Sequence, residues 1–337
     1  MSAPRLSVVV PTRNRPLALR RLLTDIAAQT IGKADFEIVV VDDGSTPAVD
    51  IATVTDGLEL DVRLLRRDAH PGAHESRLAG AEAARGARVL FLDDDVVLAR
   101  EVLAGHAGVD GDFAIGPILY HPEPSPSPYN RFKAAQYATE AEQVVGGPSR
   151  RSADELYICN ASGPTTVFRE ILGSVRTMMN GRPTPGEGFD EALMGHQLSK
   201  QRSFTRVLPS AVVYHVDTKT LGDARNERRH VGRAVSRLLV EMPELRQTIG
   251  HYARIADTIT GAAGLARMWK VRLIWMAPTA FRLVTDALTA TVDRGPARWI
   301  PDRLCRAPLV IAFWEGVRAD APSYAKLRDL LRESKGI

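Results

Sequence analysis

The sequence has little cysteine and no recognisable secretory leader, and both features exclude classes of protein. Its two cysteines, Cys159 and Cys305, lie far apart and without the spacing of metal ligands. This argues against a disulfide scaffold and a zinc site, and it fits a reducing cytoplasm. The apolar run near the N-terminus is short and ends at Pro11, so we expect no secretory signal.

Long apolar runs are also missing. A membrane-spanning helix needs about 18 or more consecutive apolar residues. The nearest candidate, residues 271–290, is interrupted by Arg272, Pro278, Arg282 and Asp286. With 45% hydrophobic and 25% charged residues, the composition is typical of a soluble globular protein. We therefore expect a cytoplasmic protein without a spanning helix.

Charge is distributed unevenly along the chain. Residues 221–337 hold 20 Lys and Arg against 12 Asp and Glu, a net charge of +8, whereas residues 1–220 carry −4. All four tryptophans lie in the basic part: Trp269, Trp275, Trp299 and Trp314. Two interpretations stay open. These helices bind peripherally at the inner face of a membrane, or they form a subdomain with Trp in its core and Arg in solvent. A homodimer also stays open, whereas no motif indicates a nucleic-acid partner.

The first hundred residues alternate short apolar runs with helical patterns. The runs that predict buried parallel strands are residues 6–10, 36–41, 62–65 and 89–92. Residues 17–28 and 76–84 have helical spacing between them. This alternation predicts an α/β fold with a Rossmann-like, doubly wound and mostly parallel sheet. Ligands bind such sheets beyond the carboxyl ends of the strands.

The later residues are more varied. Prolines predict extended loops at residues 121–129 and 181–188. We expect strands at residues 165–168 and 211–214 and a helix at residues 190–201. From about residue 223 only helical periodicity remains. We therefore predict one α/β domain over residues 1–222 and a helical, basic subdomain over residues 223–337.

The strongest chemical signal is the segment FLDDDVVL, in which Asp93, Asp94 and Asp95 follow a buried strand. Side chains two positions apart share one face of a strand, so we expect Asp93 and Asp95 to point the same way. Clustered carboxylates raise each other's pKa unless a cation neutralises them, and their hard oxygens suit Mg²⁺ or Mn²⁺. One of the three could instead cap a helix.

Two further strand ends carry polar residues. The segment VVVDDGST places Asp42 and Asp43 in a turn that we expect to expose their carboxylates. There they could accept hydrogen bonds from a ribose hydroxyl or a base N–H. The segment VVVPTRNRP could line a nucleotide pocket with Pro11 and Thr12, whereas Arg13 and Arg15 could simply be solvated.

Together these segments resemble a known family. VVVPTRNRPLALRRLL, FEIVVVDDGST and HPGAHESRLAGAEAARGARVLFLDDD are similar in order and spacing to glycosyltransferase family 2, which has the GT-A fold. GEGFDEAL and AVVYHVD resemble later landmarks of that family, so the resemblance covers about residues 5–217. It implies a nucleotide-sugar half over about residues 1–97 and an acceptor half over about residues 98–222.

The resemblance implies roles for named residues. Asp43 and Arg77 would contact the uracil or ribose of the donor, and Asp93 would lie near the ribose. The other nucleotide-binding candidates are Pro11, Thr12, Arg13 and Asp94. Asp95 would be the main metal ligand of the DxD pattern. His215 would be a further ligand or a diphosphate contact, although a lone histidine after a strand is often structural.

The catalytic base departs from the family pattern. Inverting members follow the FDE segment with a Glu-Asp pair, but here His196 and Gln197 stand at that place. His196 could take the proton, since an imidazole titrates near neutral pH. Glu187, Asp190 or Glu191 could do so instead, or the enzyme could retain the anomeric configuration. Asp190 and Glu191 could also merely cap a helix.

The function implied by the resemblance is metal-dependent sugar transfer with Mn²⁺ or Mg²⁺. The donor would be a nucleotide diphosphate sugar, UDP-linked, and the transferred group a hexosyl or N-acetylhexosaminyl unit. The acceptor hydroxyl would belong to a polysaccharide, a glycolipid or a natural-product glycoside. Two alternatives stay open: an inactive binding protein of the same fold, and a nucleotidyltransferase. The latter usually has a glycine-rich loop after its first strand, and PTRNRP has no glycine.

Overall fold

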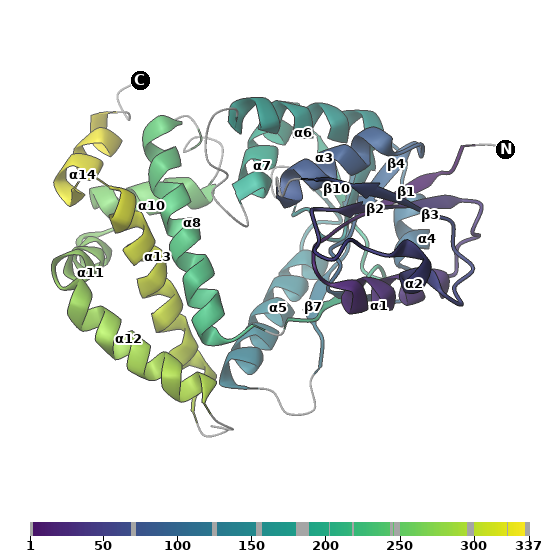
Figure 1. The fold of residues 1–337 in the computed structure, drawn as a ribbon. Coiled ribbons are helices and arrows are strands. Elements are labelled where there is room, and N and C mark those ends of the chain that lie inside the picture. Colours follow the sequence, from purple (N-terminus) through teal and green to yellow (C-terminus); the bar gives the residue numbers. More distant parts are fainter. Residues whose placement is uncertain are drawn as a thin grey trace. The chain divides into compact units, whose positions relative to one another are not determined.

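The computed structural model describes most of the chain, in two compact units (Figure 1). The described residues are 3–68, 72–122, 127–152, 157–179, 189–201, 203–217, 219–242, 245, 250–294, 300–321 and 323–333. The first unit comprises Met1–His121, Ala134–Gly181 and Gln197–Asp217. The second comprises Pro122–Lys133, Arg182–His196 and Thr218–Ile337. The predicted domains 1–222 and 223–337 stay a prediction.

A mixed sheet forms the centre of the first unit. Its order in the described part of the chain is β3-β2-β1-β4-β9-β6-β10-β8. These strands are β1 (Leu6–Thr12), β2 (Phe36–Asp42), β3 (Val62–Arg66), β4 (Arg88–Phe91), β6 (Phe113–Ile115), β8 (Arg150–Ser152), β9 (Ala161–Pro164) and β10 (Phe204–Val207). The first four in that order run parallel, and β9 is antiparallel to both neighbours. The predicted α/β fold with a mostly parallel sheet is confirmed.

A second, smaller sheet continues directly from the aspartate segment. It consists of β5 (Val96–Leu98), β11 (Val213–His215) and β7 (Ile118–Tyr120), in that order. β11 is antiparallel to β5 and pairs His215 with Val96. The pairing brings two segments that are more than a hundred residues apart to the same point, beside Asp95.

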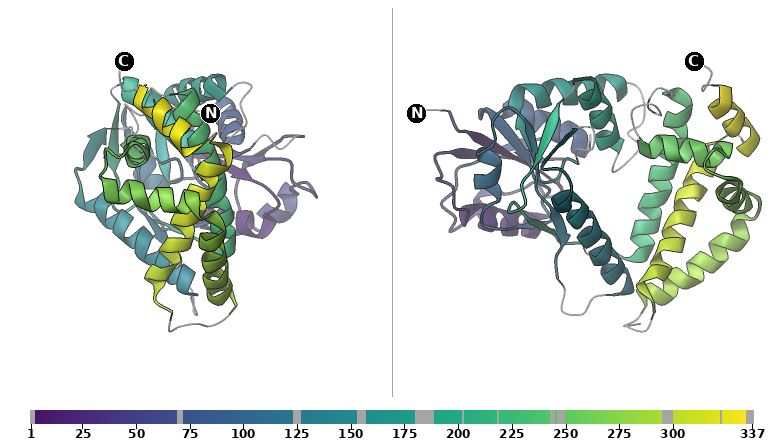
Figure 2. Two further views of the ribbon diagram at one scale, coloured as in Figure 1. Left: turned by 90° about the vertical axis from the view of Figure 1, so that its left-hand side faces the viewer. Right: turned by 180° about the vertical axis from the view of Figure 1, so that it is seen from behind.

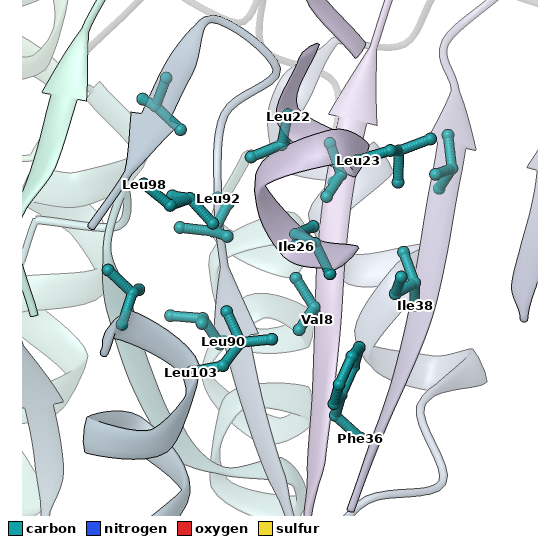
Figure 3. Packing of buried hydrophobic residues seen from close by; sticks show 14 of the residues in the cluster. Val8, Leu22, Leu23, Ile26, Phe36, Ile38, Leu90, Leu92, Leu98 and Leu103 are labelled. Carbon is teal, nitrogen blue, oxygen red and sulfur yellow. The ribbon is translucent and has the colours of Figure 1, made fainter. Parts of the chain in front are cut away.

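Helices cover both faces of the large sheet, because successive strand residues point to opposite sides. On one face lie α1 (Pro16–Ala27), α2 (Ile51–Thr55) and α4 (Val102–Ala107). Leu22, Leu23 and Ile26 of α1 pack with Val8, Ile38 and Leu90 of the strands in one buried cluster (Figure 3). The apolar spacing that predicted α1 is thus the spacing of its buried face.

The other face carries α3 (Ala73–Ala83) and α6 (Thr165–Met179). A Cβ on Gly80 of α3 would come within 2.3 Å of a methyl group of Val9, so glycine lets this helix lie close to β1. Phe168 of α6 makes edge contacts with the rings of Phe91 and Phe113. This close packing sets the position of the polar residues on α3.

Two predictions from the proline and β-rich patterns were wrong. Residues 165–168 were expected as a strand but form the first turn of α6, whose buried residues Phe168, Leu172 and Val175 recur at helical spacing. The proline-rich loop was expected to extend to residue 129, but α5 (Pro128–Gly146) begins at its last proline. Proline is compatible with the first turn of a helix, because that turn needs no N–H donor.

Other predicted elements are confirmed: α7 (Phe189–Gln201) covers the helix expected at residues 190–201, and β11 overlaps the last expected strand. The loop expected at residues 181–188 lies outside the described residues, as do residues 123–126.

Helices dominate the second unit (Figure 2). They are α8 (Leu221–Glu241), α10 (Gly250–Thr260), α11 (Leu265–Met276), α12 (Pro278–Asp293), the short 3-10 helix η2 (Asp302–Cys305), α13 (Arg306–Asp320) and α14 (Tyr324–Glu333). α8 and α13 approach so closely that a Cβ on Gly232 or Gly316 would collide with a backbone carbonyl of the partner helix. Among the described residues, no helix combines the length and the apolar character needed to cross a membrane.

Candidate functional site

The carboxyl ends of β1 and β2 supply the first polar groups of the site. Thr12 is buried at the end of β1 and donates a hydrogen bond from Oγ1 to Oδ2 of Asp94 at 2.7 Å. Asp43 follows β2, and its Oδ1 accepts a hydrogen bond from Ser76 of α3 at 2.8 Å. The Asp43 backbone N–H also binds the Thr12 carbonyl oxygen at 2.9 Å. These bonds tie two strand ends and α3 to the aspartate segment.

Asn14 fastens the loop after β1 to the loop after β2. Its backbone is left-handed, with φ of 54°, a conformation that asparagine tolerates better than most residues. Its N–H donates to Ser45 Oγ at 2.9 Å, and its side-chain oxygen accepts from the Thr46 N–H at 2.8 Å. The PTRNRP segment is therefore held in place beside the DDGST turn.

The expectation that Asp42 and Asp43 expose their carboxylates was wrong, because both residues are buried. Asp42 binds the backbone N–H groups of Ser45 and Val49 and the guanidinium of Arg66. Although burial opposes ionisation, these contacts lower the pKa of Asp42 below its usual value. Asp42 thus shapes the turn, while Asp43 is the carboxylate turned toward α3.

Arg77 and Asp93 form an ion pair across the site. Arg77 lies on α3, and its guanidinium is 2.7 Å from Oδ1 of Asp93. Burial alone would raise the pKa of Asp93, but the charge and hydrogen bond of Arg77 lower it. Asp93 is therefore an anion in this structure, next to the arginine predicted to contact a nucleotide base.

Asp94 and Asp95 share a different cation. The Arg15 guanidinium lies 3.1 Å from Oδ1 of Asp94 and 2.7 Å from Oδ2 of Asp95. The expectation that Asp93 and Asp95 share a strand face was based on a strand reaching residue 95. β4 ends at Phe91 instead, and Asp94 and Asp95 lie in a turn, so strand alternation does not apply to them.

Asp94 and Asp93 have pKa values shifted in opposite directions. Burial raises the pKa of Asp94 to about 6, and the hydrogen bonds from Thr12 and Arg15 only partly offset that increase. Asp94 is buried, whereas Asp95 keeps part of its surface. Asp94 therefore anchors the turn to β1, and Asp95 is the carboxylate directed to the partly open side.

His215 completes the group around Asp95. Its Nε2 lies 3.5 Å from Oδ1 of Asp95, because β11 pairs with the strand that follows the aspartates. The ring of Tyr137, on α5, stacks on the imidazole with a centroid separation of 5.8 Å and an angle of 19°. The imidazole is thus fixed between an aromatic ring and a carboxylate.

A divalent cation fits these donors in part. Asp95 and His215 offer an oxygen and a nitrogen at neighbouring positions, a donor set accepted by Mn²⁺ and, less readily, by Mg²⁺. Within the described residues, no group of three or more His, Cys, Asp or Glu side chains could hold a metal. Cations of this kind often take only one or two protein carboxylates and fill their other positions with water and phosphate oxygens. The residues present therefore fit an ion that is shared with a phosphate ligand.

A buried network lies behind the aspartates. Asn160, fully buried and left-handed with φ of 58°, binds the Phe91 carbonyl through its backbone N–H at 3.0 Å. Its side-chain amide donates to the carbonyls of Ala211 and Pro117 at 2.8 and 3.3 Å. Asn160 thereby joins three backbone segments that lead to β5, β7 and β11. The neighbouring Cys159 lies close to Asp93, and burial raises the pKa of its thiol.

His106 extends this network in its neutral form. Because the Asn160 amide N–H groups are used as donors, its Oδ1 accepts from His106 Nε2 at 3.0 Å. His106 Nδ1 then accepts from Ser162 Oγ at 2.8 Å, and Ser162 Oγ accepts from Arg88 Nε at 3.1 Å. Burial lowers the pKa of His106 to about 4.

The candidates for the catalytic base belong to α7. His196 is buried and falls in the second compact unit, whereas Asp93, Asp94 and Asp95 fall in the first. Asp190 and Glu191 lie in the first turn of α7, and their side chains are outside the described residues. His196, Asp190 and Glu191 stay predictions.

The structure brings together most of the other predicted residues and adds several. Pro11 and Arg13 lie on the same strand end, Pro11 half-buried and Arg13 exposed. Sequence reasoning did not assign roles to four residues that contact the group, namely Arg15, Ser76, Tyr137 and Cys159. The position of Arg15 after a strand end was the available signal. Nothing local in the sequence marks Tyr137, because strand pairing brings His215 to it.

Comparison with known proteins agrees with this geometry. Residues 7–155 match the family described as Glycosyl transferase family 2. That segment contains β2, α3, the aspartate turn and nearly all of β1, whereas His215 of the polar group lies outside it.

Curated relatives share the same N-terminal region. The PGL/p-HBAD biosynthesis glycosyltransferase of Mycobacterium tuberculosis is 34% identical over 122 residues, which cover 36% of this chain and 47% of the relative. The validoxylamine A glucosyltransferase of Streptomyces hygroscopicus subsp. limoneus is 38% identical over 111 residues, which cover 31% of this chain and 24% of the relative. The chain thus spans less than half the length of these relatives.

Solved structures extend the likeness to the fold. A mannosyltransferase from Pyrobaculum calidifontis, solved in complex with GDP-Man and Mn²⁺, superposes with a TM-score of 0.53 at 17% identity. The superposition covers 94% of this chain and 88% of the mannosyltransferase. At that identity the likeness concerns the fold alone. The segment of residues 7–155, which carries the aspartate turn at the strand ends, thus matches glycosyltransferase family 2, and the chain has a GT-A-like fold.

Proposed function

We propose that the protein transfers a sugar from a nucleoside diphosphate donor to an acceptor hydroxyl. The observation that carries the proposal is the convergence of Asp43, Arg77, Asp93, Asp95 and His215 at the carboxyl ends of the strands. α/β sheets of this type bind ligands at that edge. A polar group of this composition can hold both a nucleoside and a charged diphosphate.

In this proposal the nucleoside end of the donor lies on β1, β2 and α3. Asp43 and Arg77 contact the base or ribose, with Pro11, Thr12, Arg13 and Asp94 bordering the pocket. The Arg77–Asp93 ion pair supports this role, because it holds the planar guanidinium of Arg77 in one position. A guanidinium that is already held in place can donate hydrogen bonds to a base edge without first losing conformational entropy.

The diphosphate end of the donor lies beside Asp95. When Mn²⁺ or Mg²⁺ is bound there, it offsets the negative charge of the leaving diphosphate. Asp95 and His215 are the residues that would hold the ion, and Tyr137 keeps the His215 ring in place. Arg15, half-exposed and within reach of Asp95, can contact a phosphate oxygen directly.

The acceptor side is proposed for residues 98–222. There His196, Asp190 or Glu191 would take the proton of the attacking hydroxyl, or a retaining reaction would need no such base. Kinetics of His196→Ala separate these cases, since an unchanged turnover number removes His196 as the base. An Asp190→Asn and Glu191→Gln pair tests the carboxylates in the same way.

The donor is proposed to carry a hexosyl or N-acetylhexosaminyl unit on UDP. The named activity of one relative is glucosyl transfer, and the name of another concerns the biosynthesis of PGL and p-HBAD. The mannosyltransferase of similar fold was solved with GDP-Man, so guanine is the alternative base to test. Acceptors in polysaccharide, glycolipid or natural-product glycoside synthesis agree with these names.

The decisive experiment combines nucleotide binding with product release. Thermal unfolding is measured with UDP, GDP and their sugars, in Mn²⁺ and in chelator, for the wild type, Asp95→Asn and Asp61→Asn. Asp61 is an exposed aspartate outside the site, so it serves as the matched control. A ligand that binds only the folded state raises the melting temperature. We expect a Mn²⁺-dependent increase that Asp95→Asn abolishes.

Product release then separates the classes of function. Free nucleoside diphosphate formed from a donor sugar supports a transferase, with Asp95→Asn slower by about 10³-fold if the cation supplies several kcal/mol. Binding without release supports an inactive binding protein. Release of pyrophosphate from a nucleoside triphosphate supports a nucleotidyltransferase. No binding of any nucleotide overturns the proposal.

A further inference from the structure

The helical unit exposes an unusual amount of apolar surface on two consecutive helices. Among the described residues, half of the large hydrophobic side chains that are exposed lie on α11 and α12. These residues are Leu265, Trp269, Leu273, Met276, Leu283 and Val284. α11 and α12 follow one another through Ala277 (Figure 1). We call these six residues the α11–α12 face. Exposed apolar groups of this kind usually mark an interaction surface.

The four apolar residues of α11 form one stripe. Leu265, Trp269, Leu273 and Met276 are spaced by four, four and three residues, which places them on one side of a helix. Val271 and Ile274 of the same helix are buried and lie away from that stripe. α11 therefore has one apolar side inside the unit and a second one facing outward.

Basic residues flank the stripe. Arg272 and Lys270 are both exposed, and helical spacing puts them on opposite borders of the stripe. The Arg272 guanidinium lies over the Trp269 ring at 4.8 Å from its centroid. Arg267 and Arg282 add two more exposed cations, and the sequence has no acidic residue between Asp257 and Asp286.

We infer that the α11–α12 face docks on an anionic lipid surface. A helix with an apolar stripe, a tryptophan and cations on both borders can bury the stripe below the lipid headgroups while the cations contact phosphates. A second copy of the chain fits less well, because a twofold contact through this face brings the same cations together. The inference does not depend on the transferase activity.

The test measures binding of the full chain to vesicles by co-sedimentation. Vesicles of phosphatidylcholine alone are compared with vesicles that also contain phosphatidylglycerol, at low and high salt. We expect binding to the anionic vesicles at least about tenfold tighter than to neutral ones. The variant Leu273→Glu/Leu283→Glu should lose at least about tenfold in affinity, because carboxylates replace apolar groups at the lipid boundary.

A matched control uses Leu17→Glu on α1 of the first unit, where the side chain is 84% exposed. This variant should bind anionic vesicles as the wild type does. All variants change exposed residues, and circular dichroism with thermal unfolding verifies that they are folded. A Lys270→Gln/Arg272→Gln variant should weaken binding to anionic vesicles and leave any neutral-vesicle binding unchanged.

Four results overturn the inference. The first is no vesicle binding at low salt, and the second is equal binding by wild type and Leu273→Glu/Leu283→Glu. The third is a dimer in sedimentation velocity that this double variant dissolves, which assigns the face to a second copy. The fourth is binding to poly-glutamate as tight as to anionic vesicles, which assigns it to an acidic protein. Loss of nucleotide binding bears only on the proposed function.

Discussion

Each of the two units buries a polar network, and the two networks have different tasks. In the sheet unit, Asn160 and His106 are fully buried and join backbone segments that lead to the aspartates and to His215. In the helical unit, Arg225 of α8 is buried and binds Thr285, Thr289 and Asp286 of α12. We expect the first network to position the aspartate segment, whereas the second ties two helices together. Burial of polar groups therefore does not by itself mark a functional site.

The largest effect should come from Asn160→Ala. The change leaves the Ala211 carbonyl and the His106 N–H without their partner, and each loss costs about 1–3 kcal/mol, whereas the Pro117 carbonyl keeps its hydrogen bond from the Val213 N–H. Alanine is also less stable than asparagine at a left-handed φ. We expect the free energy of unfolding to fall by about 3 kcal/mol or more in urea titrations.

Nucleotide binding distinguishes positioning from mere stability in the same variant. If Asn160 positions the aspartate turn, the affinity for Mn²⁺ and nucleotide measured by calorimetry falls even where the variant is fully folded. Asn226→Ala, at an exposed asparagine of α8, is the matched control and should change neither quantity. If folded Asn160→Ala bound Mn²⁺ and nucleotide with wild-type affinity, the Asn160 network would contribute only to stability, as the Arg225 network does.

Arg225→Met should produce the next largest effect and should not affect the site. Methionine keeps much of the apolar stem of arginine but removes hydrogen bonds from a charged donor, each of which contributes about 1.5–3 kcal/mol to stability. Hydration of the Asp286 carboxylate by solvent then offsets part of this loss. We expect the free energy of unfolding to fall by about 2 kcal/mol, with unchanged nucleotide affinity. Weaker nucleotide binding by this variant would contradict the contrast between the two networks.

His106 should make the stability of the protein depend on pH. Its pKa is about 4 in the folded protein against 6.5 for an unperturbed histidine, so the unfolded chain binds more protons between these values. Stability due to His106 is therefore complete above about pH 6.5 and is lost as the pH falls toward 4. From pH 7 to pH 5 we expect a loss of about 2 kcal/mol in urea titrations that His106→Gln lacks.

The control for this pH dependence is His230→Gln in the helical unit. His230 is exposed, so the same substitution should leave the difference in stability between pH 7 and pH 5 as it is in the wild type. An equal effect of both substitutions would mean that burial of His106 does not control the pH dependence.

The sequence predicted the local features of the site better than its long-range ones. Strand runs and the DDD segment carry their own signal, so β1, β2, β4 and the edge that holds Asp95 could be placed in advance. The orientation of Asp93 and Asp95 could not, because it depends on where β4 stops. The strand expected at residues 165–168 became helical because tertiary packing of Phe168 against Phe91 and Phe113 outweighs β propensity.

Local sequence patterns could not predict the contacts between segments that are distant in the chain. Asn160 and Tyr137 have no motif around them, and their partners are set by the order β5-β11-β7 and by the β4–β9 pairing. The contact of Arg15 with Asp94 and Asp95 also joins residues about eighty positions apart. From the sequence, solvation was one interpretation of Arg15, because the sequence around a solvated arginine does not differ from that around an arginine that binds two distant carboxylates.

The smallest effect should come from Arg15→Gln, and it tests whether Arg15 and a divalent cation compete for Asp95. In this structure the Arg15 guanidinium occupies the carboxylate oxygens of Asp94 and Asp95. A divalent cation at Asp95 must compete with that half-exposed ion pair, which is worth about 1 kcal/mol or less. Removing the guanidinium should therefore tighten binding of Mn²⁺ alone by up to about fivefold, measured from the free-Mn²⁺ signal in electron paramagnetic resonance. Arg13→Gln removes the same charge from an exposed position two residues away and should leave Mn²⁺ affinity unchanged. Weaker Mn²⁺ binding by Arg15→Gln alone would mean that Arg15 organises the carboxylates for the cation, as the buried network does, and does not compete with it.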